Sequence, residues 1–199
     1  MKFSINEKRD LVLAGLMISA AFAILLIGGY KSLIDFNHEF LRAFGIAFFT
    51  AGIGFLLHEV MHKFVAVKYG LWAEFKAFYN MLWLALLFSL FGFIIAAPGA
   101  VFISGRGLTR VRNGKISLAG PLTNIVLALG FLIGLLVLGQ GGWLGLLFEF
   151  GLSVNSLLAA FNMIPVMPFD GAKILAWDRG IYLVVTLIAI GLFIRSLVV

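Results

Sequence analysis

The chain has 199 residues, of which 62% are hydrophobic and only 12% are charged, and its mean hydropathy is +1.10. Because so few polar residues cannot cover the surface of a soluble globular domain, the composition predicts an integral membrane protein. The absence of cysteine excludes disulfides, thiolate zinc sites and cysteine nucleophiles. Any metal must therefore be bound by His, Asp, Glu or carbonyl oxygens.

The net charge of +6 at neutral pH would be compatible with nucleic-acid binding. Lys and Arg, however, stand in short clusters between apolar segments, which is typical of cytoplasmic loops beside anionic lipid. We therefore expect the lipid bilayer as a partner and no nucleic acid.

Six apolar segments each have about the 20 residues that a helix needs to cross a bilayer. They lie at about 11–29, 42–66, 78–97, 117–138, 143–164 and 180–198. The first is too long for the apolar core of a signal peptide and lacks a small-residue cleavage pattern, so we expect it to be retained. The predicted fold is an all-α polytopic membrane protein with about six transmembrane helices in a single domain, residues 1–199.

The positive charges conflict with six simple crossings. One cluster precedes the first span, a second follows the second span, and a third precedes the fourth: Lys2, Lys8 and Arg9; Lys63, Lys68 and Lys76; Arg106, Arg110, Arg112 and Lys115. All three favour the cytoplasm, yet a single crossing by 78–97 would put the last two on opposite sides of the membrane. We therefore expect 77–105 to enter and return as a hairpin, re-entrant loop or strand-bearing excursion. The N-terminus and the active-site end are expected to face the cytoplasm, in the cell membrane.

A local pattern after this excursion predicts a β-hairpin. In RNGK, residues 112–115, the Asn113-Gly114 pair is typical of a tight turn with positive φ angles. Short strands at about 100–104 and 115–118 would flank it.

The segment LLHEVMHKFVAVKYG, residues 56–70, places two histidines and a glutamate in an apolar helix. Residues four apart share a helix face, so His58 and His62 can both ligate one Zn²⁺. Glu59 would then lie beside the metal, where it can accept a proton from bound water. Ionisable groups are costly inside an apolar helix and usually mark function, which favours a metal site over a helix end facing the headgroups.

A catalytic zinc typically needs a third protein ligand. Asp170 is well placed, because the two prolines of NMIPVMPFDG, residues 162–171, forbid a regular helix and Gly171 allows a tight turn. A simple turn aspartate is the alternative for Asp170. Glu149 lies inside the fifth span, where a role in a water path or in gating stands beside ion pairing or an interfacial position.

Three motifs in this order resemble the site-2 protease family of intramembrane zinc metalloproteases: HEVMHKFVAVKYG, AGPLTN at 119–124 and NMIPVMPFDG. The resemblance covers about 42–175. It implies that His58, His62 and Asp170 are the zinc ligands and that Glu59 is the catalytic base.

The same resemblance implies that Asn124 and Asn162 lie near the substrate or the developing oxyanion. Met61 departs from the family pattern, in which glycine is common at that position, and Ala172-Lys173 replace the usual Gly-Arg after Asp170-Gly171. We expect no accessory PDZ or CBS domain.

The expected function is hydrolysis of peptide bonds in or near transmembrane segments, by zinc-activated water with Glu59 as general base. The resemblance implies a membrane-protein substrate with a transmembrane segment. Two alternatives stay open. A divalent-metal transporter would be expected to line a path with more than one ligand cluster and often to show an inverted repeat. A non-catalytic membrane binding protein would typically have lost Glu59 or a ligand.

Overall fold

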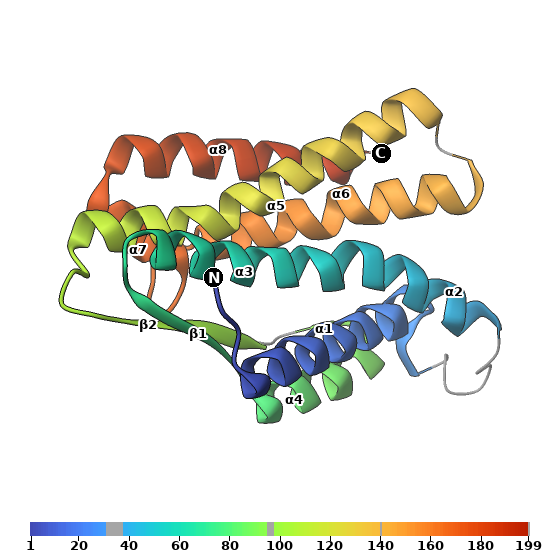
Figure 1. The fold of residues 1–199 in the computed structure, drawn as a ribbon. Coiled ribbons are helices and arrows are strands. Elements are labelled where there is room, and N and C mark those ends of the chain that lie inside the picture. The colour runs from blue at the N-terminus through green and yellow to red at the C-terminus, as the bar shows by residue number, and fades with distance from the viewer. Residues whose placement is uncertain (31–37, 95–97, 140, 199) are drawn as a thin grey trace. The chain divides into compact units, whose positions relative to one another are not determined.

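The computed structural model describes residues 1–30, 38–94, 98–139 and 141–198. In chain order the elements are α1 (Ile5–Leu26), α2 (His38–Ala47), the π-helical stretch η2 (Phe48–Gly52), α3 (Ile53–Lys68), β1 (Trp72–Ala77), α4 (Tyr79–Leu90), β2 (Gly99–Ser104), α5 (Arg110–Leu138), α6 (Gly142–Asn162), α7 (Asp170–Trp177) and α8 (Arg179–Ser196). Helices dominate the ribbon (Figure 1). The predicted all-α fold class is therefore confirmed.

The chain forms two compact units. The first contains Lys2–Leu56 and Glu74–Phe102, and the second contains Leu57–Ala73 and Ile103–Val199, with Met1. In the first unit, α1 packs against α2, η2 and α4. In the second unit, α5 packs against α6, α7 and α8, and α6 also packs against α8 (Figure 1). The expectation of a single protease domain stays a prediction.

Within the described residues, five helices are long and apolar enough to cross a membrane. They are Ile5–Leu26, His38–Lys68, Arg110–Leu138, Gly142–Asn162 and Arg179–Ser196. The predicted span 78–97 differs, because its helix α4 has only 12 residues. Such a helix is about 18 Å long, which is too short for a bilayer core. The N–H groups of Phe91 and Gly92 bond to the carbonyls of Phe88 and Ser89 in a turn that ends it. Residues 95–97 lie outside the described part of the chain.

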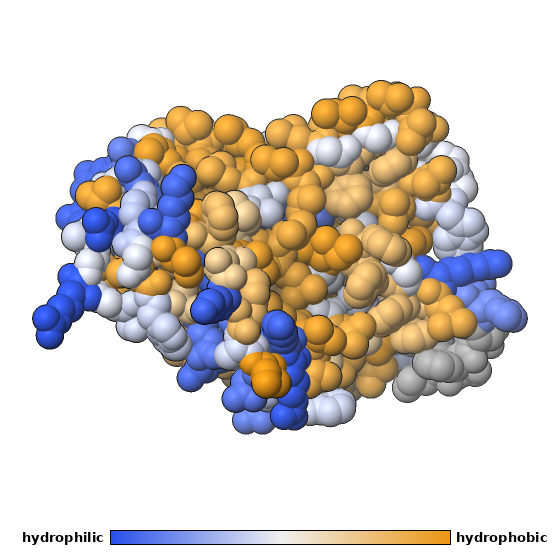
Figure 2. Space-filling model, in the orientation of Figure 1, coloured by the Kyte–Doolittle hydropathy of each residue, from blue (hydrophilic) through white to orange (hydrophobic). Residues whose placement is uncertain are grey.

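Apolar side chains cover most of the face shown in Figure 2. In the second unit, hydrophilic residues gather where α5 and α8 begin (Figure 2). Large apolar side chains on α5 are exposed, among them Val126, Ile133 and Leu136. A contiguous apolar surface of this kind needs lipid or protein to cover it, and together with the five long helices it identifies a membrane protein.

The strands β1 and β2 pair in a two-stranded sheet. The N–H of Phe78 donates to the Pro98 carbonyl at 3.0 Å, and Gly99 faces Phe75 and the Lys76 carbonyl. The start of β2 therefore meets the end of β1, which makes the pairing antiparallel. The chain leaves β1 and returns to it, so the predicted strand-bearing excursion after the histidine helix is confirmed.

The predicted turn at 112–115 and strand at 115–118 are wrong, because α5 runs through both. The Thr109 hydroxyl caps this helix by accepting the N–H of Arg112 at 3.2 Å. Gly114 lies against the side chain of Trp177, where a Cβ would collide. Glycine at this position therefore allows α7 to pack closely on α5, and it does not form a turn. The predicted strand at 100–104 is confirmed as β2, with β1 as its partner.

Two carboxylates of α1 bind the backbone of β1. Buried Glu7 accepts the N–H of Phe75 at 3.0 Å, and Asp10 accepts the N–H of Ala77 at 3.0 Å and the Tyr79 hydroxyl at 2.6 Å. Neighbouring residues of a strand direct their N–H groups to opposite edges, and the Phe78 N–H points to β2. Phe75 and Ala77 therefore face the other edge, where the carboxylates replace a further strand.

We predict that Glu7→Ala lowers the free energy of unfolding by about 1–3 kcal/mol, because the Phe75 N–H loses a charged acceptor in a buried place. Unfolding in detergent by titration with a denaturing surfactant measures the change. Asn6→Ala, an exposed position of the same helix turn, is the matched control. Equal stability of the two variants would contradict a structural role for the Glu7 carboxylate.

Candidate metal centre

Helix α3 carries His58, Glu59 and His62 in a continuous stretch of apolar helix. Their exposed fractions are 5%, 8% and 7%, so all three lie out of water. The two imidazole rings are 4.7 Å apart between centroids and nearly perpendicular, at 85°. The spacing of four residues thus places both rings on one helix face, as predicted.

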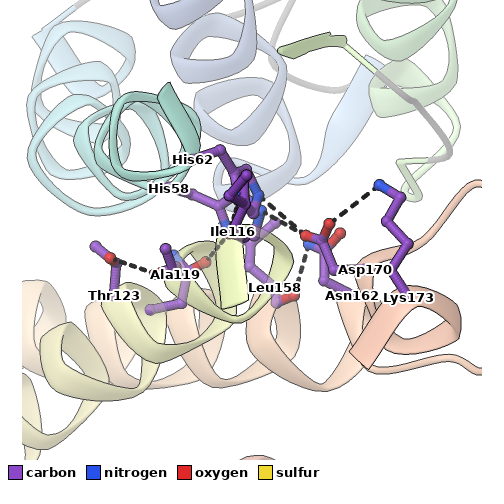
Figure 3. A network of polar contacts seen from close by, with 10 residues as sticks. His58, His62, Ile116, Ala119, Thr123, Leu158, Asn162, Asp170 and Lys173 are labelled. Carbon is purple, nitrogen blue, oxygen red and sulfur yellow. Dashed lines mark hydrogen bonds and ion pairs between the residues drawn. The ribbon is translucent and has the colours of Figure 1, made fainter. Parts of the chain in front are cut away.

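Asp170 is the first residue of α7. The preceding helix α6 ends at Asn162, before Pro165 and Pro168. The Asp170 Oδ2 atom lies 3.4 Å from His58 Nε2 and 3.0 Å from His62 Nε2 (Figure 3). Asp170 is buried and faces both histidines, which is not the position of a solvent-facing turn aspartate.

The donor set of this cluster fits zinc. One ligand atom from each of His58, His62 and Asp170 can be chosen so that all lie within 4.8 Å of one another. Two imidazole nitrogens and a carboxylate oxygen are ligands that Zn²⁺ binds in catalytic sites, where a fourth position stays open. A buried carboxylate between two imidazoles also needs a strong partner, since its desolvation is costly.

Asp170 lies outside the five candidate spans. Burial raises the pKa of its carboxyl, but the neighbouring imidazoles of His62 and His58 lower this pKa, and the net effect is a pKa well below the usual range. The carboxylate is therefore ionised at neutral pH, as a metal ligand must be.

Both histidines form a hydrogen bond to α5 through Nδ1, the ring nitrogen that faces away from Asp170. His62 Nδ1 lies 2.8 Å from the Ile116 carbonyl oxygen, and His58 Nδ1 lies 2.6 Å from Asn124 Oδ1. A carbonyl oxygen only accepts, so Nδ1 of His62 donates to Ile116, and Nε2 is the nitrogen that faces Asp170 and is left for a metal. Such a backing hydrogen bond fixes the ring and its tautomer in metal sites.

The chain is similar to proteins that bear a metalloprotease name. A protein of Methanocaldococcus jannaschii named "Putative zinc metalloprotease MJ0611" is 43% identical over 179 residues, which are 88% of this chain and 91% of that protein. The chain belongs to this family of zinc metalloproteases. Membership agrees with the resemblance of the three motifs to the site-2 proteases.

A second relative of this metalloprotease is "Putative zinc metalloprotease Rip3" of Mycobacterium tuberculosis. The two are 28% identical over 166 residues, which are 77% of this chain but only 35% of Rip3. No family model matches the chain. No solved structure matches it either.

Lys173 of the metalloprotease stands where arginine is usual in the site-2 protease motif. Its Nζ lies 3.4 Å from Asp170 Oδ1, while Asp170 Oδ2 faces the histidines (Figure 3). The Lys173 ammonium thus pairs with the carboxylate oxygen of Asp170 that is not the one facing the imidazoles. A lysine at this position therefore keeps a cation beside Asp170.

The other predicted residues lie at different places around the cluster. Asn162 is half-buried in the last turn of α6, and its amide nitrogen donates to the Leu158 carbonyl at 2.9 Å (Figure 3). Asn124 is fully buried, with its carbonyl oxygen on His58. Glu149 lies in α6, about 20 Å along the helix axis from Asn162.

Three groups at the site escaped the sequence-based prediction as functional residues: the Ile116 carbonyl, Gly120 and Asn155. The backbone carbonyl of Ile116 leaves no signal in the sequence. Asn155 did leave one, because an amide inside the apolar segment 143–164 is a recognised candidate for contacts between membrane helices.

Gly120 lies next to Nε2 of His58 and Nε2 of His62. A Cβ at this position would be 2.5 Å from Nε2 of His58 and 2.5 Å from Nε2 of His62. Only glycine lets α5 approach the imidazoles this closely. The glycine of AGPLTN therefore shapes the space next to the ligand atoms.

We predict that Gly120→Ala weakens zinc binding at least about tenfold, because the added methyl group displaces both imidazoles from their common face. Gly130→Ala, in the same helix but with open space around the added Cβ, is the matched control and should bind zinc like wild type. Competition of purified protein with a fluorescent zinc chelator measures both. Tight binding by Gly120→Ala would contradict this role of the glycine.

Proposed function

We propose that the protein is an intramembrane zinc metalloprotease that hydrolyses peptide bonds in or near transmembrane segments of membrane proteins. The observation that supports this most directly is the buried cluster of His58, His62 and Asp170. The two histidines lie in the candidate span His38–Lys68, where buried Glu59 directly follows His58. Family membership supports the metalloprotease activity, and the apolar helix supports a site inside the membrane.

In this proposal, Nε2 of His58, Nε2 of His62 and a carboxylate oxygen of Asp170 hold the zinc. A zinc ion at such a site supplies Lewis acidity, which polarises a carbonyl and lowers the pKa of water. Glu59 follows His58 directly in α3 and is buried beside it. Its carboxylate takes the proton of the attacking water as general base and returns it to the leaving amine.

The two asparagines have different roles in this proposal. Asn124 has its carbonyl oxygen on His58 and its amide nitrogen 3.0 Å from Asn155 Oδ1, and it supports His58. Because its side chain is 0% exposed, it is a poor oxyanion donor. Asn162 is the better candidate, because its half-buried amide uses one hydrogen on Leu158 and carries a second. That hydrogen can be donated to a developing oxyanion.

The two alternatives are supported less well. A metal transporter would be expected to line a path with several ligand clusters, but in the described part of the chain His58, His62 and Asp170 are the single group found. A binding protein without activity would typically lack a ligand or the base, and here Glu59 and all three ligand candidates are present.

We place the protein in the cell membrane with the N-terminus and the active-site end in the cytoplasm. The antiparallel strands bring the ends of 77–105 together, so the positive clusters before and after this segment can face one side. Water would then reach Glu59 from the cytoplasmic side.

We predict that Glu59→Gln lowers the cleavage rate at least about 100-fold while zinc binding is kept, because only the base is lost. A panel of labelled single-span substrates in liposomes measures cleavage, and metal analysis measures zinc. Glu39→Gln, the same change at an exposed position, is the matched control. Removal of zinc by a chelator should also abolish cleavage, and zinc should restore it.

A zinc-loaded wild-type protein that cuts no member of the panel would favour the binding-protein alternative. Zinc flux across the same liposomes would instead favour the transporter.

We further propose that the substrate unwinds and adds as a strand to the outer edge of β2, as extended peptides do at other sheet edges. The Glu7 and Asp10 carboxylates occupy the outer edge of β1, so the sheet can grow only at β2. Every residue of β2 keeps accessible surface. Because Pro98 faces β1, alternation directs the N–H of Val101 to the outer edge.

We predict that Val101→Pro slows cleavage about tenfold, because proline removes one hydrogen-bond donor at the outer edge and leaves the pairing with β1 intact. Val101→Thr, which keeps the N–H and the branched shape, should cleave at the wild-type rate. Cleavage by Val101→Pro at the rate of Val101→Thr would contradict strand addition at this edge.

A further inference from the structure

A line of hydrogen bonds joins α6 to His58 of α3 through Asn124 of α5. Asn155 Nδ2 donates to the Gly151 carbonyl at 3.0 Å, Asn124 Nδ2 donates to Asn155 Oδ1 at 3.0 Å, and Asn124 Oδ1 lies 2.6 Å from His58 Nδ1. Both asparagines are 0% exposed. Two buried amides in series are costly to desolvate, so their bonds must be well satisfied.

The direction of this line is fixed at its α6 end. The Gly151 carbonyl can only accept, so Asn155 must turn its NH₂ group to Gly151 and its oxygen to Asn124. Asn124 must then turn its NH₂ group to Asn155 and its oxygen to His58. An oxygen facing Nδ1 requires a proton on that nitrogen, so the lone pair of the neutral ring resides on Nε2.

Without these hydrogen bonds, Asp170 would favour the opposite tautomer of His58, with the proton on Nε2. Asp170 Oδ2 lies 3.4 Å from His58 Nε2 and favours a proton there. A reversed Asn124 amide would offer its NH₂ group to Nδ1 and favour the same tautomer. A proton on Nε2 would remove the lone pair that faces the zinc site.

We propose that Asn155 is a positioning residue for the metal centre: through the Asn124 amide it holds His58 in the Nδ1–H tautomer, so that Nε2 is the metal-binding nitrogen. This inference rests on the zinc site of the proposed function. His62 needs no such relay, because a backbone carbonyl, that of Ile116, faces its Nδ1 directly. The two ligands of one helix thus differ in how their tautomers are set.

The first measurement is the tautomer itself, by ¹⁵N NMR of histidine-labelled, zinc-free protein in detergent at a pH where the imidazoles are neutral. In wild type we expect His58 with its proton on Nδ1. In Asn155→Leu we expect His58 to shift toward the Nε2–H form while His62 stays unchanged. An unchanged His58 in this variant would overturn the proposal.

The second measurement is the zinc dissociation constant. Asn155→Leu should raise it about 10–100-fold, as loss of an outer partner of a metal ligand typically does. Ser156→Ala, a change at the neighbouring buried polar residue of α6, is the matched control and should leave it unchanged. If Asn155→Leu does not fold, Asn155→Ser, whose side chain is too short to reach Asn124, replaces it.

A double-mutant cycle separates positioning from packing. In Asn124→Asp a carboxylate oxygen accepts from His58 Nδ1 whichever way it is turned, so the tautomer no longer depends on Asn155. Adding Asn155→Leu to Asn124→Asp should therefore change the dissociation constant less than about twofold. Equal effects of Asn155→Leu in both backgrounds would show a packing role and overturn the proposal.

The proposed function can fail separately from this inference. A wild-type protein that binds no zinc would sink the zinc site, while the tautomer of zinc-free His58 would still decide the role of Asn155. Normal zinc binding by Asn155→Leu, with normal binding by wild type, would overturn the positioning role alone.

Discussion

The cost of removing ionisable groups from water governs the second unit of this protein. His58, His62 and Asp170 are buried together, and none of them could be placed there without partners. Helix α5 supplies these partners on the back of the imidazoles, with a backbone carbonyl, an amide side chain and a glycine that leaves room for the rings. Helix α3 therefore holds the two imidazoles in this arrangement only in contact with α5.

Local connectivity ties this pair of helices to the small sheet. Helix α3 ends at Lys68, shortly before β1 begins, and β2 ends at Ser104, shortly before α5 begins. The antiparallel pairing of β1 with β2 thus closes the chain between the ligand helix and the helix behind it. Because its two ends are paired, the segment between β1 and β2 can be long without separating α3 from α5.

The sequence was a good guide where a local rule decides the structure. The i, i+4 spacing predicted the shared face of His58 and His62, the prolines predicted a break before Asp170, and the charge clusters predicted the returning segment. The local rule failed at Asn113-Gly114, where packing of Gly114 on Trp177 keeps the chain helical. Hydropathy predicted a full span at 78–97, where helix α4 has only 12 residues, because hydropathy measures composition and not helix length. The pairing of β1 with β2 and the bonds of Asn155 join residues far apart in the chain and leave no periodic pattern.

The carboxylates of Glu7 and Asp10 also limit how copies of this protein can associate. Most two-stranded sheets have two open edges, so copies can join edge to edge without end. Here one edge is already occupied by α1. Two molecules that met through their β2 strands would complete each other and leave no open strand, so such contact would end in a closed pair and could not grow into a ribbon within the crowded plane of a membrane.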